Sequence, residues 1–258
     1  MADPAGAAVE PSLIAAHVKP YIQQTLTTKA LHFSISELQS RMDVRRPDAL
    51  DLEYTRLMMG FLLFVPVPAR LAMIGLGGGS LAKFCHRHLA GTHIGVVEIN
   101  PHVIALRDDF KVPADSPRFG VLLGDGAVFV RQQAAPLDVL LVDGFDYDGL
   151  PDALSSQRFY DDCAARLAPA GLMVANLHVG HPQYQQQIER IRRSFAGAMR
   201  VVDDSDGSNS IVFAGRGPGI TPLGVAPTRR PRGVDNAGWT SLQADFARIV
   251  SAAQAEAT

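Results

Sequence analysis

Short apolar segments alternate with segments of helical periodicity over most of this 258-residue chain. Apolar runs bounded by glycine, proline and polar residues predict buried strands, whereas apolar residues three and four positions apart predict amphipathic helices. The predicted strands cover residues 71–75, 93–98, 119–124, 137–142, 171–177, 199–203 and 209–214, and the predicted helices cover residues 80–90, 101–110, 126–133, 156–168 and 183–196. Strands and helices that alternate in this way form a mainly parallel sheet covered on both faces.

The last two predicted strands lie too close together for a helical crossover. Only residues 205–208, which include a glycine, separate MRVVDD from NSIVFAG, so these strands form an antiparallel hairpin. The six-stranded dinucleotide-binding sheet has no such hairpin. The sequence therefore predicts an α/β fold with a seven-stranded, mainly parallel sheet of the class I S-adenosylmethionine-dependent methyltransferase type, ending in an antiparallel hairpin.

Other patterned segments flank this sheet. Before it we expect a helix around Ser12–Leu26 that is interrupted or ends near Pro20, a small β-hairpin built from residues 30–36 and 39–42, and a buried helix over Leu50–Phe64. After it, a Pro/Gly/Arg-rich linker leads to an amphipathic helix over Thr240–Ala255. The predicted organisation is an N-terminal extension (1–66), a Rossmann-like domain (67–216), and a linker with a C-terminal helix (217–258).

The composition of the chain bears on whether it binds nucleic acid, a metal ion or a membrane. Lys and Arg number 24 against 26 Asp and Glu, without blocks of like charge, so we expect no nucleic-acid partner. The histidines lack metal-ligand spacing, and no metal is expected. Cys85 and Cys163 lie in predicted helices, which suits a reducing compartment. With no signal-peptide pattern at the start and no apolar run long enough to span a bilayer, we expect a cytoplasmic protein without a membrane partner.

A glycine-rich turn follows the first strand of the predicted sheet. Its glycines are Gly75, Gly77, Gly78 and Gly79, and a helix begins near Ser80. Glycines let a backbone approach a ligand closely, and a helix N-terminus offers unpaired N–H groups. Glu98 ends the next strand, where a carboxylate can accept hydrogen bonds from both ribose hydroxyls of a nucleotide. These features predict a nucleoside-binding βαβ unit over Leu71–Asn100, and hence a nucleoside-binding catalytic domain over residues 67–216. Glycines in this pattern can also serve a tight turn alone.

A second candidate group follows the third strand. Asp125 lies between Gly124 and Gly126, at the strand end where open α/β sheets bind ligands. Its carboxylate can accept a hydrogen bond from an exocyclic amine such as that of adenine. It can equally cap the helix that follows, and both roles are compatible.

Four carboxylates follow the fourth strand within ten residues, namely those of Asp143, Asp146, Asp148 and Asp152. Acids this close raise one another's pKa, and one held near neutrality can act as a general base toward an amine. They would also attract a cationic substrate or a sulfonium. The alternative is a solvated acidic turn without a ligand.

These segments together resemble the polyamine aminopropyltransferases, or spermidine synthases, and their methyltransferase-like relatives. The resemblance runs from about Ala30 to Ala214. It rests on VVEINPHVI (96–104), GDG (124–126), VDGFDYDG (142–149) and LSSQRFYDDCAARLAPAG (154–171), together with Gln39 and the upstream LEYTRLMM segment.

The resemblance implies a role for each matching residue. It places Glu98 on the ribose hydroxyls, Asp125 at the adenine amine and Gln39 against the nucleoside. It places Asp143 beside the reacting chain of the donor. Tyr54 would position the attacking amine, and Asp146 would be the base that deprotonates it. The remaining donor-binding positions that it implies are Gly75, Gly77, Gly78, Gly79 and Gly126.

Three positions depart from the family pattern. Gly78 stands where the family has an aspartate that pairs with the ammonium of the decarboxylated donor, Thr55 where it has histidine, and Tyr147 where it has proline. Loss of that carboxylate removes a charge-assisted hydrogen bond of about 1.5–3 kcal/mol. It also removes a charge that would repel the carboxylate of ordinary S-adenosylmethionine, so the loop is permissive for either donor.

Three functions follow from these features. The first is transfer of an aminopropyl group from decarboxylated S-adenosylmethionine to a diamine such as putrescine, with Asp146 as base. The second is methyl or alkyl transfer from S-adenosylmethionine to a small amine or related acceptor, and the third is a non-catalytic nucleoside-binding module. A nicotinamide oxidoreductase is disfavoured by the hairpin and the GDG segment. The resemblance and the apolar terminal helices also lead us to expect a homodimer.

Overall fold

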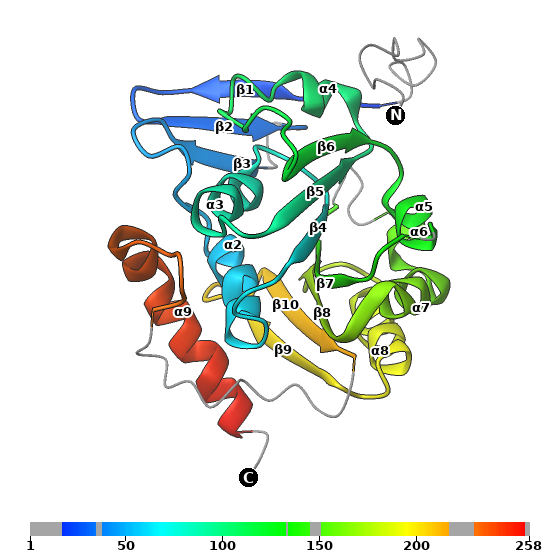
Figure 1. The fold of residues 1–258 in the computed structure, drawn as a ribbon. Coiled ribbons are helices and arrows are strands. Elements are labelled where there is room, and N and C mark those ends of the chain that lie inside the picture. The colour runs from blue at the N-terminus through cyan, green and yellow to red at the C-terminus, as the bar shows by residue number, and fades with distance from the viewer. Residues whose placement is uncertain (1–16, 35–37, 133, 145–150, 217–229, 256–258) are drawn as a thin grey trace.

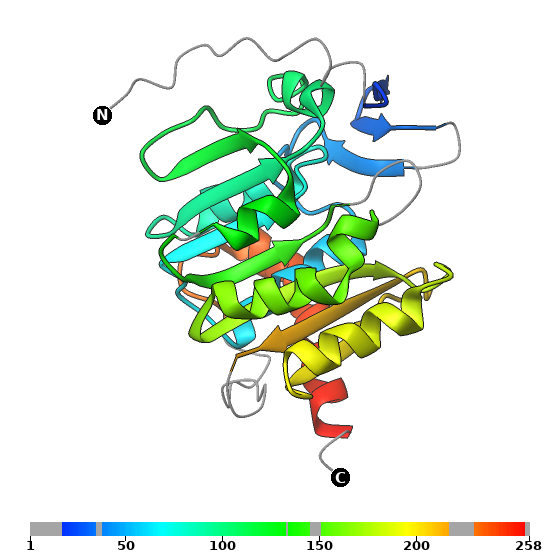
Figure 2. The same cartoon turned by 90° about the vertical axis from the view of Figure 1, so that its right-hand side faces the viewer.

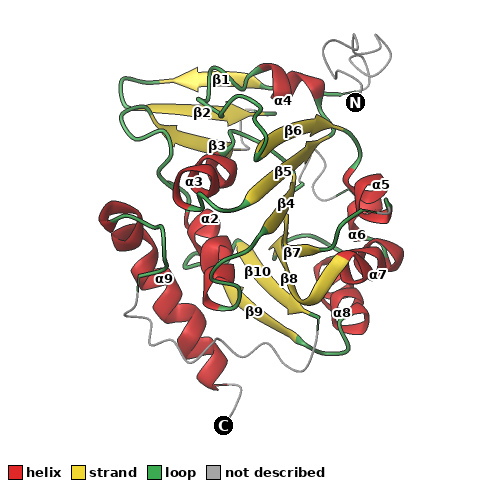
Figure 3. Ribbon diagram, viewed as in Figure 1, coloured by secondary structure: helices red, strands yellow, loops and turns green. Residues whose placement is uncertain are grey.

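The computed structural model describes residues 17–34, 38–132, 134–144, 151–216 and 230–255, and its centre is a seven-stranded sheet (Figures 1 and 3). The strand order is β6-β5-β4-β7-β8-β10-β9. Parallel pairing joins β6 through β8, whereas β10 runs antiparallel to both of its neighbours. The strands are β4 (Arg70–Ile74), β5 (His93–Glu98), β6 (Phe119–Leu123), β7 (Leu137–Val142), β8 (Leu167–His178), β9 (Met199–Asp203) and β10 (Asn209–Gly215). The predicted seven-stranded sheet and its C-terminal hairpin are confirmed.

Alternate residues of the central strands build two hydrophobic cores, one on each face of the sheet. Met73 and Leu141 belong to one core, while their neighbours Ile74 and Leu140 belong to the other. The first face is covered by α2 (Glu53–Met58), the 3-10 helix η1 (Met59–Leu63), α3 (Ser80–His88), α4 (Pro101–Ala105) and α9 (Asn236–Ala255). The second is covered by α5 (Gly126–Arg131), α6 (Asp152–Ser155), α7 (Gln157–Arg166) and α8 (Tyr184–Ser194). Figure 2 shows α7 and α8 lying side by side across that face.

A second, three-stranded antiparallel sheet lies above one end of the central sheet (Figure 1). It consists of β1 (Tyr21–Gln24), β2 (Thr28–His32) and β3 (Leu38–Asp43). The predicted hairpin corresponds to β2 and β3. The helix predicted around Ser12–Leu26, with an interruption or end near Pro20, is wrong where the structure describes it. Residues 17–20 are not helical, and residues 21–24 pair with β2 along their whole length. Pro20 precedes this strand, and pairing with β2 satisfies backbone groups that a short isolated helix would leave exposed.

Most other differences from prediction concern where helices begin and end. The predicted buried helix over Leu50–Phe64 divides into α2 and η1, and the predicted helix 156–168 is shorter and preceded by the separate turn α6. The predicted helix 101–110 ends as α4 at Ala105. The C-terminal helix begins earlier than predicted, and it packs along α2 and η1 with Leu242 and Phe246 fully buried. No helix in the described ranges is long and apolar enough to cross a membrane.

Candidate active site

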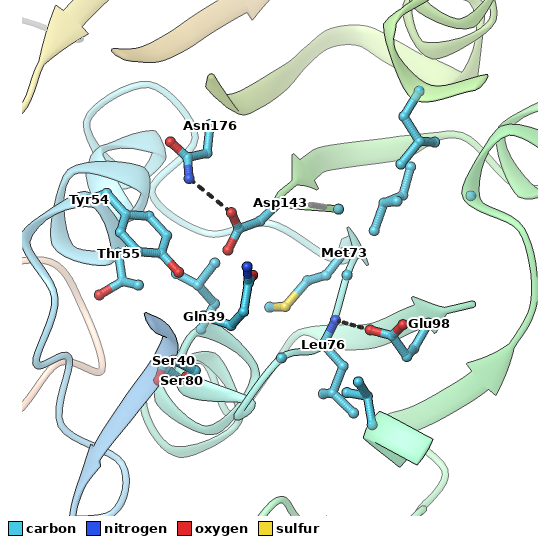
Figure 4. Close-up of a pocket in the computed structure, with 18 of the residues that line it drawn as sticks. Gln39, Ser40, Tyr54, Thr55, Met73, Leu76, Ser80, Glu98, Asp143 and Asn176 are labelled. Carbon is cyan, nitrogen blue, oxygen red and sulfur yellow. Dashed lines mark hydrogen bonds between the residues drawn. The ribbon is translucent and has the colours of Figure 1, made fainter. Parts of the chain in front are cut away.

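A cavity of about 510 Å³ opens at the carboxyl ends of β4 and β7. From β4 the chain proceeds outward to β5 and β6 on one side, and then returns to β7 and β8 on the other. This is the topological switch point of the sheet, where α/β folds bind ligands. Loops that follow β4, β5, β6 and β7 line the cavity, and residues of β3, α2 and α3 close its other side (Figure 4).

The glycine loop after β4 brings two strand ends into contact. Gly75 has a φ of 95°, and a Cβ there would collide with the backbone oxygen of Asp143. Only glycine therefore allows the loops after β4 and β7 to meet at the cavity wall. Gly75 and Gly77 line the cavity. Gly78 and Gly79 are not among the residues that line it. A Cβ at position 78 would lie 2.5 Å from Ser40 Oγ.

Glu98 stands at the carboxyl end of β5 and is buried in the cavity wall. Its Oε2 accepts a hydrogen bond from Leu76 N at 2.9 Å (Figure 4). Its Oε1 accepts one from Asn100 N at 2.8 Å. Burial raises the pKa of Glu98, and the hydrogen bonds from the backbone offset part of that rise. The carboxylate thus fixes the glycine loop through one oxygen and the chain after β5 through the other. Each oxygen keeps acceptor capacity for a ligand.

Asp125 combines a structural contact with a place in the cavity wall. Its Oδ1 accepts hydrogen bonds from Ala127 N at 2.6 Å and Val128 N at 3.4 Å, so it caps α5. The second carboxylate oxygen is not used by the cap. Gly126 also lines the cavity, and a Cβ there would collide with Ile74, so close packing of α5 on β4 requires this glycine.

Asp143 is the centre of a polar cluster at the end of β7. Its Oδ1 accepts a hydrogen bond from Asn176 Nδ2 at 3.0 Å, and the Tyr54 phenol from α2 approaches the same carboxylate (Figure 4). Burial raises the pKa of Asp143, while the Asn176 amide and the Tyr54 hydroxyl act to lower it. Burial and then the charge of Asp143 raise the pKa of Tyr54, so the phenol stays protonated. The cluster presents an oriented carboxylate to the cavity.

Apart from Glu53 of α2, the polar side chains that β3, α2 and α3 bring to the cavity are uncharged. Gln39 projects into the cavity from β3, next to Ser40 (Figure 4). Ser40 Oγ lies 3.4 Å from the Oγ of Ser80, the first residue of α3, and both side chains are buried. Thr55 is buried beside Tyr54, and its Oγ1 donates to Leu52 O at 2.6 Å. Hydroxyl and amide groups therefore face the ligand space here.

The cavity lining is rich in carboxylates. Six line the cavity, and the described lining residues include no lysine or arginine. Glu53 is neutralised by an ion pair with Arg248. Asp204 is held by the turn between β9 and β10, since it accepts hydrogen bonds from Ser208 and Asn209. The potential in this cavity favours cationic ligands.

One predicted catalytic residue cannot be located. Asp146 falls in residues 145–150, outside the described residues, and so do Tyr147 and Asp148. In the ranges that the structure does describe, no group of three or more His, Cys, Asp or Glu side chains is placed to hold a metal ion.

Sequence reasoning missed several cavity residues. Asn176 is a polar residue in the otherwise apolar segment 172–177 near the end of β8, and a polar side chain at that position marks a candidate ligand contact. Ser40 carries no comparable signal, because only the packing of β3 against α3 brings it to the cavity. Asp204 lies in the predicted hairpin turn, and its place at the cavity follows from the insertion of β10 beside β8.

Comparison with known proteins identifies the family. The family model for the spermine/spermidine synthase domain matches residues 51–204. The polyamine aminopropyltransferase of Chromobacterium violaceum is 38% identical over 195 residues, which cover 75% of each chain. The residues that the family model matches include strands β4 to β7, whose following loops line the cavity.

Two solved structures share the fold. A probable spermidine synthase from Corynebacterium glutamicum has a TM-score of 0.66 at 20% identity, covering 76% of each chain. Human methyltransferase-like protein 13, solved in complex with SAH, has a TM-score of 0.59 at 22% identity, covering 76% of this chain and 92% of its own. The class I methyltransferase type of sheet is thereby confirmed. The chain belongs to the spermine/spermidine synthase family and is a transferase.

Proposed function

We propose that this protein transfers an aminopropyl group from decarboxylated S-adenosylmethionine to a diamine such as putrescine, releasing methylthioadenosine. The observation that carries the proposal is the charge of the cavity. A carboxylate-lined cavity with no lysine or arginine among its described residues suits a cationic donor and a cationic acceptor. Membership of the spermine/spermidine synthase family supports the same reaction class.

The nucleoside part of the donor would lie along the ends of β4, β5 and β6. Glu98 would accept both ribose hydroxyls with the acceptor capacity left beside its two backbone hydrogen bonds. Asp125 would accept the adenine amine with the carboxylate oxygen that does not cap α5. Gly75 and Gly77 leave space for the nucleoside against the backbone.

The reaction would take place beside Asp143. The acceptor nitrogen attacks the carbon next to the sulfonium, a C–N bond forms, the C–S bond breaks, and its electron pair returns to sulfur. The attacking nitrogen must have an unprotonated lone pair, so a base has to remove a proton from the ammonium form. We assign that role to Asp146. Asp143, oriented by Asn176 and Tyr54, would hold the reacting chain by charge and position it for in-line attack.

A second candidate is methyl or alkyl transfer from S-adenosylmethionine itself. The uncharged side of the cavity formed by Gln39, Ser40 and Ser80 supports it, since hydroxyl and amide groups can donate hydrogen bonds to the donor carboxylate. The absence of lysine and arginine from the described lining opposes it, because such a carboxylate would enter an acidic cavity without a countercharge.

A turnover assay separates the candidates. Purified protein is supplied with putrescine and either donor, and the released nucleoside is identified by chromatography. Aminopropyl transfer predicts methylthioadenosine from the decarboxylated donor, whereas S-adenosylhomocysteine from the ordinary donor would support methyl transfer. Asp143→Asn should lower kcat/KM by roughly 100-fold or more. The matched control Asp162→Asn, which changes an α7 carboxylate outside the cavity lining, should leave turnover unchanged.

A further inference from the structure

The cavity contains a serine pair to which the proposed aminopropyl transfer has so far assigned no role. Ser40 comes from β3 and Ser80 from the start of α3, and their hydroxyl oxygens are 3.4 Å apart. Both side chains are buried and both line the cavity (Figure 4). At 3.4 Å, their mutual hydrogen bond is long for an O–H···O contact, so each hydroxyl retains capacity for a ligand.

The serine pair takes the space that a side chain at position 78 would need. A Cβ on Gly78 would lie 2.5 Å from Ser40 Oγ and 3.0 Å from Phe110 Cδ1. Both distances are too short for packed atoms, so a larger residue at position 78 would displace Ser40. The functional groups at this end of the cavity therefore come from β3 and α3 and not from the glycine loop.

The geometry of the reaction leaves this side of the cavity for one part of the donor. In the function proposed above, on which this inference rests, the acceptor amine approaches from the side of Asp143 and Tyr54, in line with the breaking C–S bond. The ribose lies at Glu98. The aminopropyl chain is short, so its terminal amine must end on a wall of the same cavity. Two polar walls remain. Glu53, Asp204 and Asp206 form an acidic wall near the turn between β9 and β10. Gln39, Ser40 and Ser80 form an uncharged wall beside the glycine loop, on the side of the nucleoside (Figure 4).

We propose that the hydroxyls of Ser40 and Ser80 bind the terminal amine of the donor's aminopropyl chain. Each hydroxyl would accept an N–H hydrogen bond from the ammonium, without a carboxylate at this end. A hydroxyl can also donate to a carboxylate, so these groups do not reject ordinary S-adenosylmethionine by charge. The serine pair would thus bind the donor amine without adding a charge that repels the donor carboxylate.

Binding calorimetry with three ligands tests this assignment. Decarboxylated S-adenosylmethionine and S-adenosylmethionine both carry the amine, whereas methylthioadenosine lacks it and reports on the nucleoside site alone. We expect Ser40→Ala and Ser80→Ala each to weaken binding of the decarboxylated donor roughly tenfold, as expected for loss of a hydrogen bond to a charged group. Binding of methylthioadenosine should stay within about twofold of the parent value. Ser241→Ala, a serine on α9 that bonds Gly238 O, is the matched control.

A variant designed to distinguish the two donors more strongly provides an independent test. Ser80→Asp places a carboxylate at the first position of α3, where the helix dipole favours negative charge. We expect it to shift the affinity ratio roughly tenfold toward the decarboxylated donor.

Several results would overturn the assignment. In the first, the alanine variants bind the decarboxylated donor as tightly as the parent does. In the second, their affinities for methylthioadenosine and for the decarboxylated donor fall by the same factor. In the third, Ser80→Asp leaves the ratio of the two donor affinities unchanged. A parent protein that binds neither the decarboxylated donor nor methylthioadenosine would instead refute the proposed function, and the inference with it.

Discussion

Replacing Glu98 with glutamine should weaken nucleoside binding without unfolding the protein. The carboxylate accepts Leu76 N on Oε2 and Asn100 N on Oε1. A glutamine amide has only one oxygen. In either orientation, its NH₂ group therefore faces one of these backbone N–H groups.

The expected loss of binding affinity follows from the number of acceptor oxygens. In the proposed complex the same two oxygens accept the ribose hydroxyls, and glutamine can accept only with one. Loss of one hydrogen bond to a charged group costs about 1.5–3 kcal/mol, which corresponds to roughly 10- to 150-fold weaker binding. The folding stability of the ligand-free protein should fall by less than this. Burial raises the pKa of Glu98, which means that keeping this carboxylate ionised destabilises the folded protein. Glutamine is neutral and removes this destabilisation, which offsets part of the stability lost with the backbone hydrogen bond.

The assay is calorimetric titration with methylthioadenosine at neutral pH, accompanied by a melting curve. Glu189→Gln is the matched control, since Glu189 lies on α8 and pairs with Arg193 away from the cavity. We expect weaker binding with a melting temperature close to that of the parent. An affinity within threefold of the parent value would refute the ribose role of Glu98. A large fall in melting temperature would show that Glu98 is chiefly structural.

Three further predictions follow from the buried groups. Asn176→Ala removes a donor that lowers the pKa of Asp143, so the acidic limb of the kcat/KM profile should move to higher pH, and an unmoved limb would contradict the assignment. Asp143→Asn should raise the melting temperature at pH 7. Burial raises the pKa of Asp143 in the folded protein, so the parent loses stability as the pH rises through that pKa and the carboxyl ionises. The gain in the variant should fade below about pH 4, where this carboxyl is protonated in both the folded and the unfolded parent. Phe246→Ala removes a fully buried ring of α9 and should cost roughly 3–5 kcal/mol in urea unfolding, whereas a loss below 1 kcal/mol would mean that α9 contributes little to the fold.

The order of strands and helices could be predicted because local periodicity reflects burial on this sheet. The central strands are apolar throughout since both of their faces are covered, and the turn after Asp203 is short enough to require a hairpin. The carboxyl ends of parallel strands meet at one edge. The sequence therefore also indicated that Glu98, Asp125 and Asp143 would line one cavity.

Other features depend on contacts between distant segments. Strand β1 forms because β2 offers it backbone hydrogen-bond partners. The sequence of this segment carries no strand signal strong enough to override the apolar pattern that predicted a helix. Ser40 and Ser80 are 40 residues apart in sequence and meet only when β3 packs against α3. The sequence showed that position 78 lacks a carboxylate, but the structure shows that Ser40 fills the adjacent space.

The mass of the product made from a mixture of donors tests the central claim most directly. The protein is incubated with putrescine and equal amounts of decarboxylated and ordinary S-adenosylmethionine, and the amine product is measured by mass spectrometry. Our account predicts putrescine heavier by one aminopropyl unit, formed in step with methylthioadenosine. Putrescine heavier by one methyl group, or an unchanged amine with both donors intact, would contradict it.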